Sequence, residues 1–125
     1  MVNRELEIKE IKQVIQDYKD SCFNKNPEKL KSLFHPQAIM VGYLKDQLIY
    51  GTPEPFINDI ANNPSMAESG VDFKSEIKLI EVAGKTATVI YEETGFFGEV
   101  DFSNFFHLLK GDEGWKIVCK TFTSI

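Results

Sequence analysis

The chain has 125 residues, a formal net charge of −5 and a hydrophobic content of 42%. This size fits one domain with a single core, here residues 1–125, and the negative charge disfavours nucleic acid and anionic membranes as partners. The first ten residues lack the apolar run of a secretory signal, and no stretch approaches the ~20 apolar residues of a membrane span.

Two helices are predicted at the start of the chain. An apolar stripe from Ile8 to Cys22, at steps of three and four, predicts one amphipathic helix over residues 3–23. Asn26 before a proline is typical of a second helix start. This short helix should end near His35, because a residue that precedes proline avoids helical geometry.

The middle of the chain alternates between strand and helix signals. Residues 38–51 read as two strands around a polar turn. Thr52 and the proline after it predict a third helix, with Phe56 on its apolar side. Residues 65–70 are small and polar apart from Met66, so we expect a mobile surface loop there.

Longer strands fill the second half. Strands are expected over residues 71–82 and 86–94, and the glycines of residues 95–98 should bend the chain before the next strand. Residues 100–109 and 115–122 then form a hairpin around a glycine-containing turn. Helices first and a meander of strands afterwards indicate an α+β fold, with the helices on one face of the sheet.

Strict alternation along the last hairpin assigns its two faces. One face carries Phe102, Asn104, Phe106 and Leu108 with Trp115, Ile117, Cys119 and Thr121. The other carries Phe105, His107 and Leu109 with Val118, Lys120 and Phe122. Because both faces are largely apolar, the hairpin should lie centrally and be covered on each side.

The cysteines and histidines suggest no metal or cofactor. Cys22 and Cys119 lack the spacing of a metal site, and two separated histidines add no ligand set. We interpret both cysteines as buried small hydrophobic residues of a reduced, cytoplasmic protein, with a reactive or paired thiol as the alternative. No phosphate-binding or dinucleotide-binding glycine pattern is present.

The segments 104–110, 114–118 and 120–122 carry a resemblance to a known family. They read NFFHLLK, GWKIV and KTF, and Tyr18, residues 34–38 and residues 87–89 fit the same pattern. The chain is similar to the family described as putative lumazine-binding, within the nuclear transport factor 2-like superfamily. Asn104 stands where many relatives carry aspartate, which removes a general base from that position.

The resemblance implies a cystatin-like cone, in which a curved antiparallel sheet wraps around three helices. It also implies a cavity between the first helix and the concave sheet face. Superfamily members often pair through the outer sheet face, which here would use Phe105, His107, Lys120 and Phe122.

Several residues are candidates for that cavity. Tyr18 would donate a hydrogen bond, Asn104 would orient a ligand carbonyl or amide, and Glu93 would act as an acid or base. The structural alternatives are a packed tyrosine, an asparagine bound to backbone and the solvated end of a strand. The full set of cavity candidates is Tyr18, Tyr43, Phe56, Tyr91, Glu93, Phe102, Asn104 and Phe106.

Three functions fit these observations. The first is a homodimeric protein that binds a small apolar or heterocyclic molecule in the cavity. The second is an acid–base enzyme of the ketosteroid isomerase or dehydratase type, working through Tyr18 and Glu93. The third is an interaction module with a filled cavity.

Overall fold

The structure is a computed structural model that describes residues 3–125, with three helices and six strands. In chain order these are α1 (Arg4–Phe23), α2 (Pro27–Ser32), β1 (Phe34–Leu44), β2 (Gln47–Gly51), α3 (Glu54–Asn62), β3 (Lys74–Ala83), β4 (Thr86–Phe96), β5 (Val100–Gly111) and β6 (Gly114–Ser124). No helix within residues 3–125 combines the length and apolar content needed to cross a membrane.

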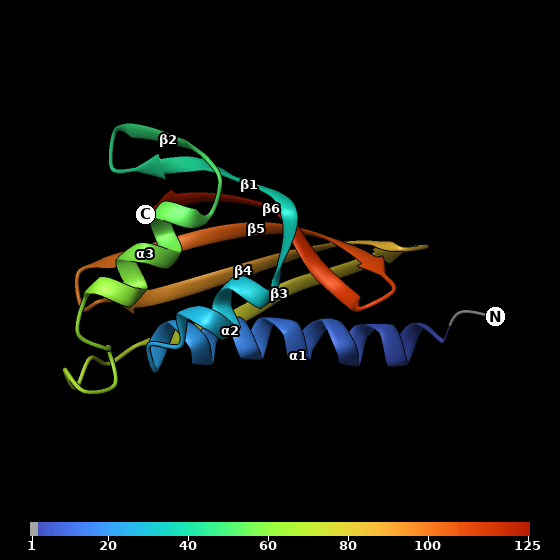
Figure 1. Cartoon of the computed structure of the whole chain (residues 1–125), viewed down its shortest axis with the longest axis horizontal. Helices are drawn as coiled ribbons and strands as arrows, with labels where there is room; N and C mark the ends of the chain where they lie inside the picture. The colour runs from blue at the N-terminus through green and yellow to red at the C-terminus, as the bar shows by residue number, and fades with distance from the viewer. Residues whose placement is uncertain (1–2) are drawn as a thin grey trace.

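The strands form one curved sheet in the order β2-β1-β6-β5-β4-β3. All neighbours run antiparallel except β1 and β6, which pair in parallel. α1 runs along one face of the sheet, and α3 lies near the end formed by β1 and β2 (Figure 1). The predicted α+β class is confirmed, and the predicted central hairpin is the pair β5 and β6.

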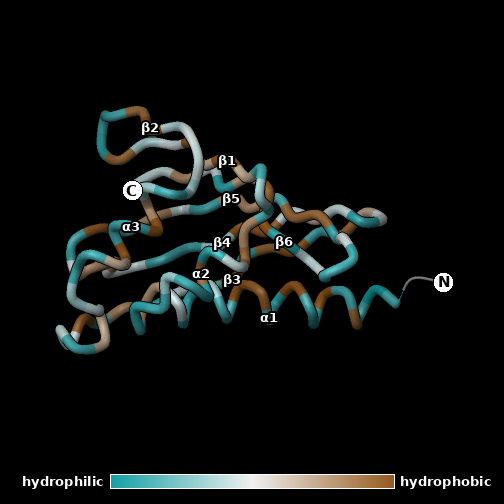
Figure 2. Tube along the Cα trace, viewed as in Figure 1, coloured by the Kyte–Doolittle hydropathy of each residue, from teal (hydrophilic) through white to brown (hydrophobic). Residues whose placement is uncertain are grey.

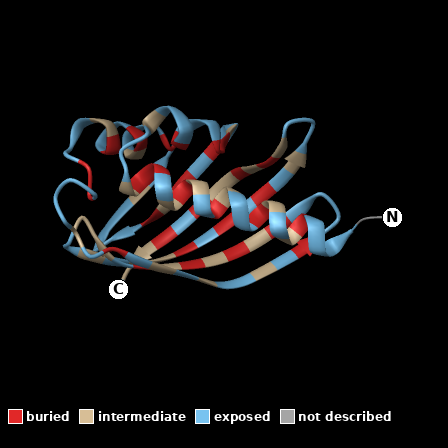
Figure 3. Ribbon diagram, turned by 90° about the horizontal axis from the view of Figure 1, so that it is seen from below, coloured by how far each residue is buried: buried red, intermediate tan, exposed pale blue. Residues whose placement is uncertain are grey.

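α1 forms where the apolar stripe predicted it. The Asn3 side chain caps the helix by accepting a hydrogen bond from the Leu6 amide at 3.2 Å. Its sheet-facing side is hydrophobic and buried, as Figures 2 and 3 show, and carries Ile11, Ile15, Tyr18 and Cys22. This burial holds α1 against the strands.

A buried carboxylate ties the start of α1 to the central hairpin. Glu7 accepts hydrogen bonds from the Trp115 indole, at 2.7 Å, and from the Lys110 ammonium. The bond with Lys110 lowers the pKa of the Glu7 carboxyl. Because these partners come from both strands of the hairpin, they fix where α1 lies along it.

The predicted faces of β6 are wrong beyond Ile117. The pairing of β5 with β6 passes from Leu108–Ile117 to His107–Cys119, which leaves Val118 unpaired in a β-bulge. One extra residue reverses the alternation. Lys120 and Phe122 therefore lie on the buried inner face, and the prediction that both belong to an outer dimer surface is corrected.

The extra residue lies in β6, so the alternation along β5 is uninterrupted and the predicted faces of β5 are confirmed. Asn104 and Phe106 are fully buried on the inner face, whereas Phe105 and His107 are exposed on the outer one.

Cys22 is buried as predicted, but Cys119 is only partly buried because the bulge turns it outward. The cytoplasmic location inferred from the two thiols stays a prediction.

Two local predictions need correction. α2 ends at Ser32, and His35 already belongs to β1, where its Nδ1 accepts a bond from the Gln37 amide. The segment 65–70 is anchored rather than free. Met66 is fully buried, and its sulfur and carbonyl accept bonds from the amides of Phe97 and Val71.

We predict that Met66→Ala lowers the free energy of unfolding by about 2–5 kcal/mol, because it empties a fully buried site. Urea denaturation measures the change. Glu68→Ala, at an exposed position two residues further along the same segment, is the control and should change stability by less than about 0.5 kcal/mol. Equal, small effects of both substitutions would show that the segment is not anchored.

Candidate functional site

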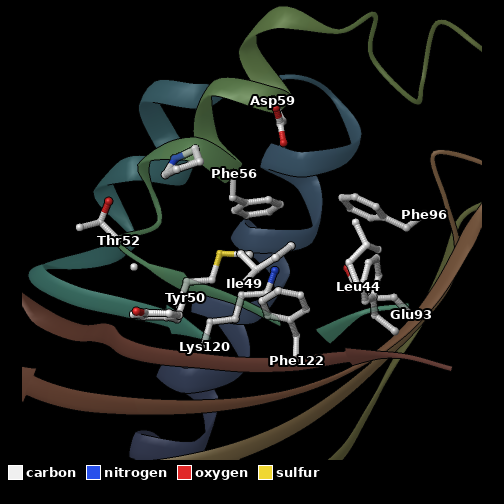
Figure 4. Close-up of a pocket in the computed structure, with 14 residues that line it drawn as sticks. Leu44, Ile49, Tyr50, Thr52, Phe56, Asp59, Glu93, Phe96, Lys120 and Phe122 are labelled. Carbon is white, nitrogen blue, oxygen red and sulfur yellow. The ribbon is translucent and has the colours of Figure 1, made fainter. Parts of the chain in front are cut away.

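A pocket of about 260 Å³ opens between α3, the β1–β2 hairpin and the inner face of the sheet (Figure 4). Its wall is mainly apolar. The lining residues are Met40, Leu44, Ile49, Tyr50, Gly51, Thr52, Pro55, Phe56, Asp59, Glu93, Phe96, Phe102, Lys120 and Phe122. A concave apolar site with a few polar groups is the usual form of a small-molecule site.

The pocket lies against α3, whereas the cavity was expected against α1. A second, more open pocket of about 290 Å³ does lie there, between Lys12, Ile15, Gln16 and Lys19 of α1 and Ser75, Ile77 and Tyr91 of the sheet. Aromatic rings separate the two pockets. The Tyr18 ring stacks on Phe56 at 6.2 Å between centroids and contacts Phe106 edge-on at 5.0 Å. Tyr18 therefore lies one layer below the pocket and supports its aromatic floor.

Lys120 extends from β6 towards the ring of Phe56 (Figure 4). Its Nζ lies 4.0 Å from the Phe56 centroid, 5.4 Å from that of Tyr18 and 5.3 Å from that of Phe122. The residue is only 5% exposed, and within residues 3–125 its Nζ has neither a hydrogen bond nor an ion pair. Aromatic faces favour a cation at these distances, but they leave the donors of Lys120 unused.

Glu93 lines the same pocket from β4 and is 2% exposed. Asn104 on β5 donates one hydrogen bond to Glu93 Oε1 at 2.7 Å and another to the Tyr91 carbonyl at 3.2 Å. Glu93 Oε2 and Asn104 Oδ1 have no partner in the described part of the chain. Asn104 thus positions the carboxyl group, and one carboxyl oxygen remains free for another group.

Burial shifts both ionisable groups towards their neutral forms. It raises the pKa of the Glu93 carboxyl, although Lys120 and the Asn104 hydrogen bond pull that pKa down. Burial also lowers the pKa of the Lys120 ammonium, which Glu93 partly counteracts. A carboxylic acid and an amine side chain in one dry pocket can both donate hydrogen bonds to an acceptor oxygen of a ligand.

The structure distributes the eight predicted residues over three places. Phe56, Glu93 and Phe102 line the pocket. Tyr18, Tyr91, Asn104 and Phe106 are buried behind it. Tyr43 points away and is 49% exposed, because it alternates with the inward-facing residues of β1.

Lys120 is the buried ionisable pocket residue that sequence reasoning missed. The sequence signal for it was a lysine flanked, two residues before and two residues after, by the apolar residues Val118 and Phe122. Strict alternation placed all three outside, and the bulge at Val118 left no mark that would correct it.

The wall around Phe122 depends on a glycine. Gly42 in β1 pairs with Phe122 in β6, and a Cβ at position 42 would lie 2.0 Å from the Phe122 carbonyl oxygen and 2.7 Å from its ring. Only a residue without a side chain lets the two strands approach this closely. Across residues 3–125 no group of three His, Cys, Asp or Glu side chains is arranged to hold a metal ion.

We predict that Lys120→Met raises the free energy of unfolding by about 1–3 kcal/mol near neutral pH, because it removes a buried donor that lacks a partner. The folded-state pKa of Lys120 lies below its ordinary value of 10.5. Wild-type stability should therefore rise as the pH increases from that lowered pKa towards 10.5, and the advantage of the variant should shrink.

Urea denaturation across this pH range measures the difference. Lys116→Met, on the same strand but with its ammonium bound to the Ser32 carbonyl, is the control and should gain no such stability. A pH-independent effect of Lys120→Met would contradict a shifted lysine.

Comparison with solved structures shows the fold. A nuclear transport factor 2-like protein of unknown function from Shewanella baltica matches with a TM-score of 0.88 at 22% identity, covering 100% of this chain and 98% of that one. A similar protein of unknown function from Methylobacillus flagellatus matches at 0.86 and 26% identity, covering 99% and 95%.

A structure from Streptomyces avermitilis, described as a putative dehydratase of the same superfamily, matches with a TM-score of 0.66 at 11% identity, covering 98% and 99%. A cystatin-like fold protein from Burkholderia xenovorans matches at 0.73. The comparison with curated proteins found no match. The family described as putative lumazine-binding matches residues 6–123, so the chain belongs to this family, with a nuclear transport factor 2-like fold.

Proposed function

We propose that this protein binds one small, mainly apolar molecule in the pocket beneath α3 and holds an acceptor oxygen of that molecule with Lys120 and Glu93. One observation carries the proposal: a mainly apolar pocket is lined by two buried ionisable side chains, of which Glu93 has one carboxyl oxygen without a partner and Lys120 makes neither a hydrogen bond nor an ion pair within residues 3–125. A buried polar group without a partner costs free energy, which a ligand oxygen would recover.

The dimensions of the pocket restrict the ligand. At about 260 Å³ the pocket falls just below the ~300–1,000 Å³ found for small-molecule sites, so a bound ligand must be small. Aromatic rings from Phe56, Phe96, Phe102 and Phe122 favour a flat ring. The family description names lumazine, so pteridines belong in a ligand screen together with flavins, small aromatic acids and small ketones.

An acid–base enzyme is the second candidate, because Glu93 is a buried carboxyl with a raised pKa in the pocket wall. Tyr18, its expected partner, does not reach the pocket. Lys120 would take that place as the second proton-transfer group. The third alternative, an interaction module with a filled cavity, has less support because the pocket is open.

A thermal-shift screen tests ligand binding. A compound at a concentration of 100 times its Kd should stabilise the protein by about 2.7 kcal/mol. Ile49→Trp, which fills the pocket from β2, should abolish this shift. Leu48→Trp is the matched control, since Leu48 is 54% exposed and does not line the pocket.

Two results would decide between the candidates. If no compound shifts the wild type, or if both tryptophan variants bind equally well, this pocket is not the binding site. For a bound small ketone, NMR can follow exchange of its α-hydrogens with solvent deuterium. Exchange that falls at least about 100-fold in Glu93→Gln would identify the acid–base enzyme.

Homodimerisation through the outer sheet face is the other part of the proposal. Its support is the exposed apolar surface over the central strands, where Ile39, Phe105 and Leu109 are 50%, 40% and 38% exposed. His107 lies on the same face. Lys120 and Phe122 do not belong to it.

We expect Phe105→Glu to convert a dimer into a monomer, because it places a charge at the centre of this surface. Sedimentation equilibrium measures the mass. Gln47→Glu adds the same charge at the exposed first residue of β2 and should leave the mass unchanged. A wild-type monomer at all concentrations would contradict the dimer.

A further inference from the structure

Lys110 and Lys120 both direct their amines towards the helices that cover the sheet, but the two amines have different surroundings. Lys110 reaches Glu7 and forms an ion pair with it. Lys120 is more deeply buried and lies among aromatic rings, and no carboxylate of residues 3–125 comes within ion-pair distance of it. A lysine that serves only as a charged anchor in the fold would resemble Lys110. Lys120 instead presents an amine to an apolar space of ligand size.

Glu93 lines the same space, with its carboxyl group buried in the wall. Asn104 donates to Oε1, so this oxygen is the acceptor of the carboxyl group, and the neutral acid carries its proton on Oε2. Oε2 has no partner in the described structure. An amine and a carboxylic acid in one dry pocket are the two groups that condensation with a carbonyl compound requires.

We infer that Lys120 forms a reversible Schiff base with a small aldehyde or ketone held in the pocket, with Glu93 as the acid. This inference rests on the proposed binding function and names the ligand class. The neutral amine attacks the carbonyl carbon, and one amine proton moves to the carbonyl oxygen to give a carbinolamine. Glu93 then protonates the hydroxyl group, which leaves as water while the C=N bond forms. The remaining nitrogen proton returns to Glu93.

The groups around Lys120 set how much neutral amine is present. Burial lowers the pKa of Lys120, whereas Glu93 from β4 and Cys22 from α1 raise it. Tyr18 from α1 lies below the amine with its own pKa raised by burial, and Asp59 from α3 lines the pocket. Burial is the largest of these effects, so Lys120 holds more reactive amine near neutral pH than an exposed lysine does.

Reductive trapping tests the inference. Benzaldehyde and cyanoborohydride at neutral pH should add one benzyl group to the wild type, and peptide mapping should place it on Lys120. Labelling there should be at least about tenfold faster than at Lys116 of the same strand, because burial increases the fraction of neutral amine at Lys120. Lys120→Met should lose this label, Lys116→Met should keep it, and Glu93→Gln should slow it.

Pocket variants give a second readout that does not depend on the folding of Lys120→Met. Ile49→Trp should protect Lys120 from the label, whereas Leu48→Trp should not. Thermal shifts with benzaldehyde and with benzyl alcohol, which has no carbonyl, report binding alone. Binding of both without a reducible adduct on Lys120, or labelling no faster than at Lys116, would overturn the Schiff base and leave the proposed binding function standing. No binding by these probes or by any compound of the screen would overturn both.

Discussion

Val118 has no partner in β5, and the chemistry of the pocket depends on that single unpaired residue. The bulge lies in the middle of the sheet, between the two most central strands. Beyond it, β6 presents the opposite set of side chains to the concave face. Without the bulge, Cys119 and Thr121 would face α3, and Lys120 would face solvent. The pocket would then lose the Lys120 amine and keep the Glu93 carboxyl group.

With the bulge in place, the protein buries two ionisable groups within a mainly apolar pocket wall. Such burial costs free energy unless each group finds a partner. Asn104 donates a hydrogen bond to one oxygen of the Glu93 carboxyl group, and the other oxygen has no partner. Aromatic rings lie near the Lys120 ammonium but accept no conventional hydrogen bond from it. The fold's other buried carboxylate, Glu7, accepts two hydrogen bonds and fixes α1. Glu7 is thus a carboxylate that serves the architecture, whereas in our proposal Glu93 and Lys120 are available to a ligand.

The sequence predicted those parts of the fold that depend on periodicity. The apolar stripe of α1, the cap at Asn26 and the alternation along β5 all carry their signal in neighbouring residues. Placement of Asn104 inward and His107 outward followed from the same rule. Glu93 was also identified from its face of β4.

Other features depend on contacts between distant segments, which leave no local pattern. The bulge at Val118 reversed Lys120 and Phe122, and the parallel pairing of β1 with β6 was not foreseen. Met66 stands alone in a polar segment, yet tertiary contacts bury it. The cavity was expected at α1 because fold resemblance placed it there, whereas the pocket that contains Lys120 and Glu93 lies beneath α3, and the rings of Tyr18, Phe106 and Tyr91 pack beside it.

Gly42 links the parallel strand pair to the shape of the pocket. Its missing side chain lets β1 lie against the Phe122 backbone, and the Phe122 ring in turn contacts Lys120. Position 42 therefore acts on the amine through two strands without touching it. A lineage that replaced Gly42 with alanine would have to move β1 away from β6. The pocket around the Lys120 ammonium would then change its shape.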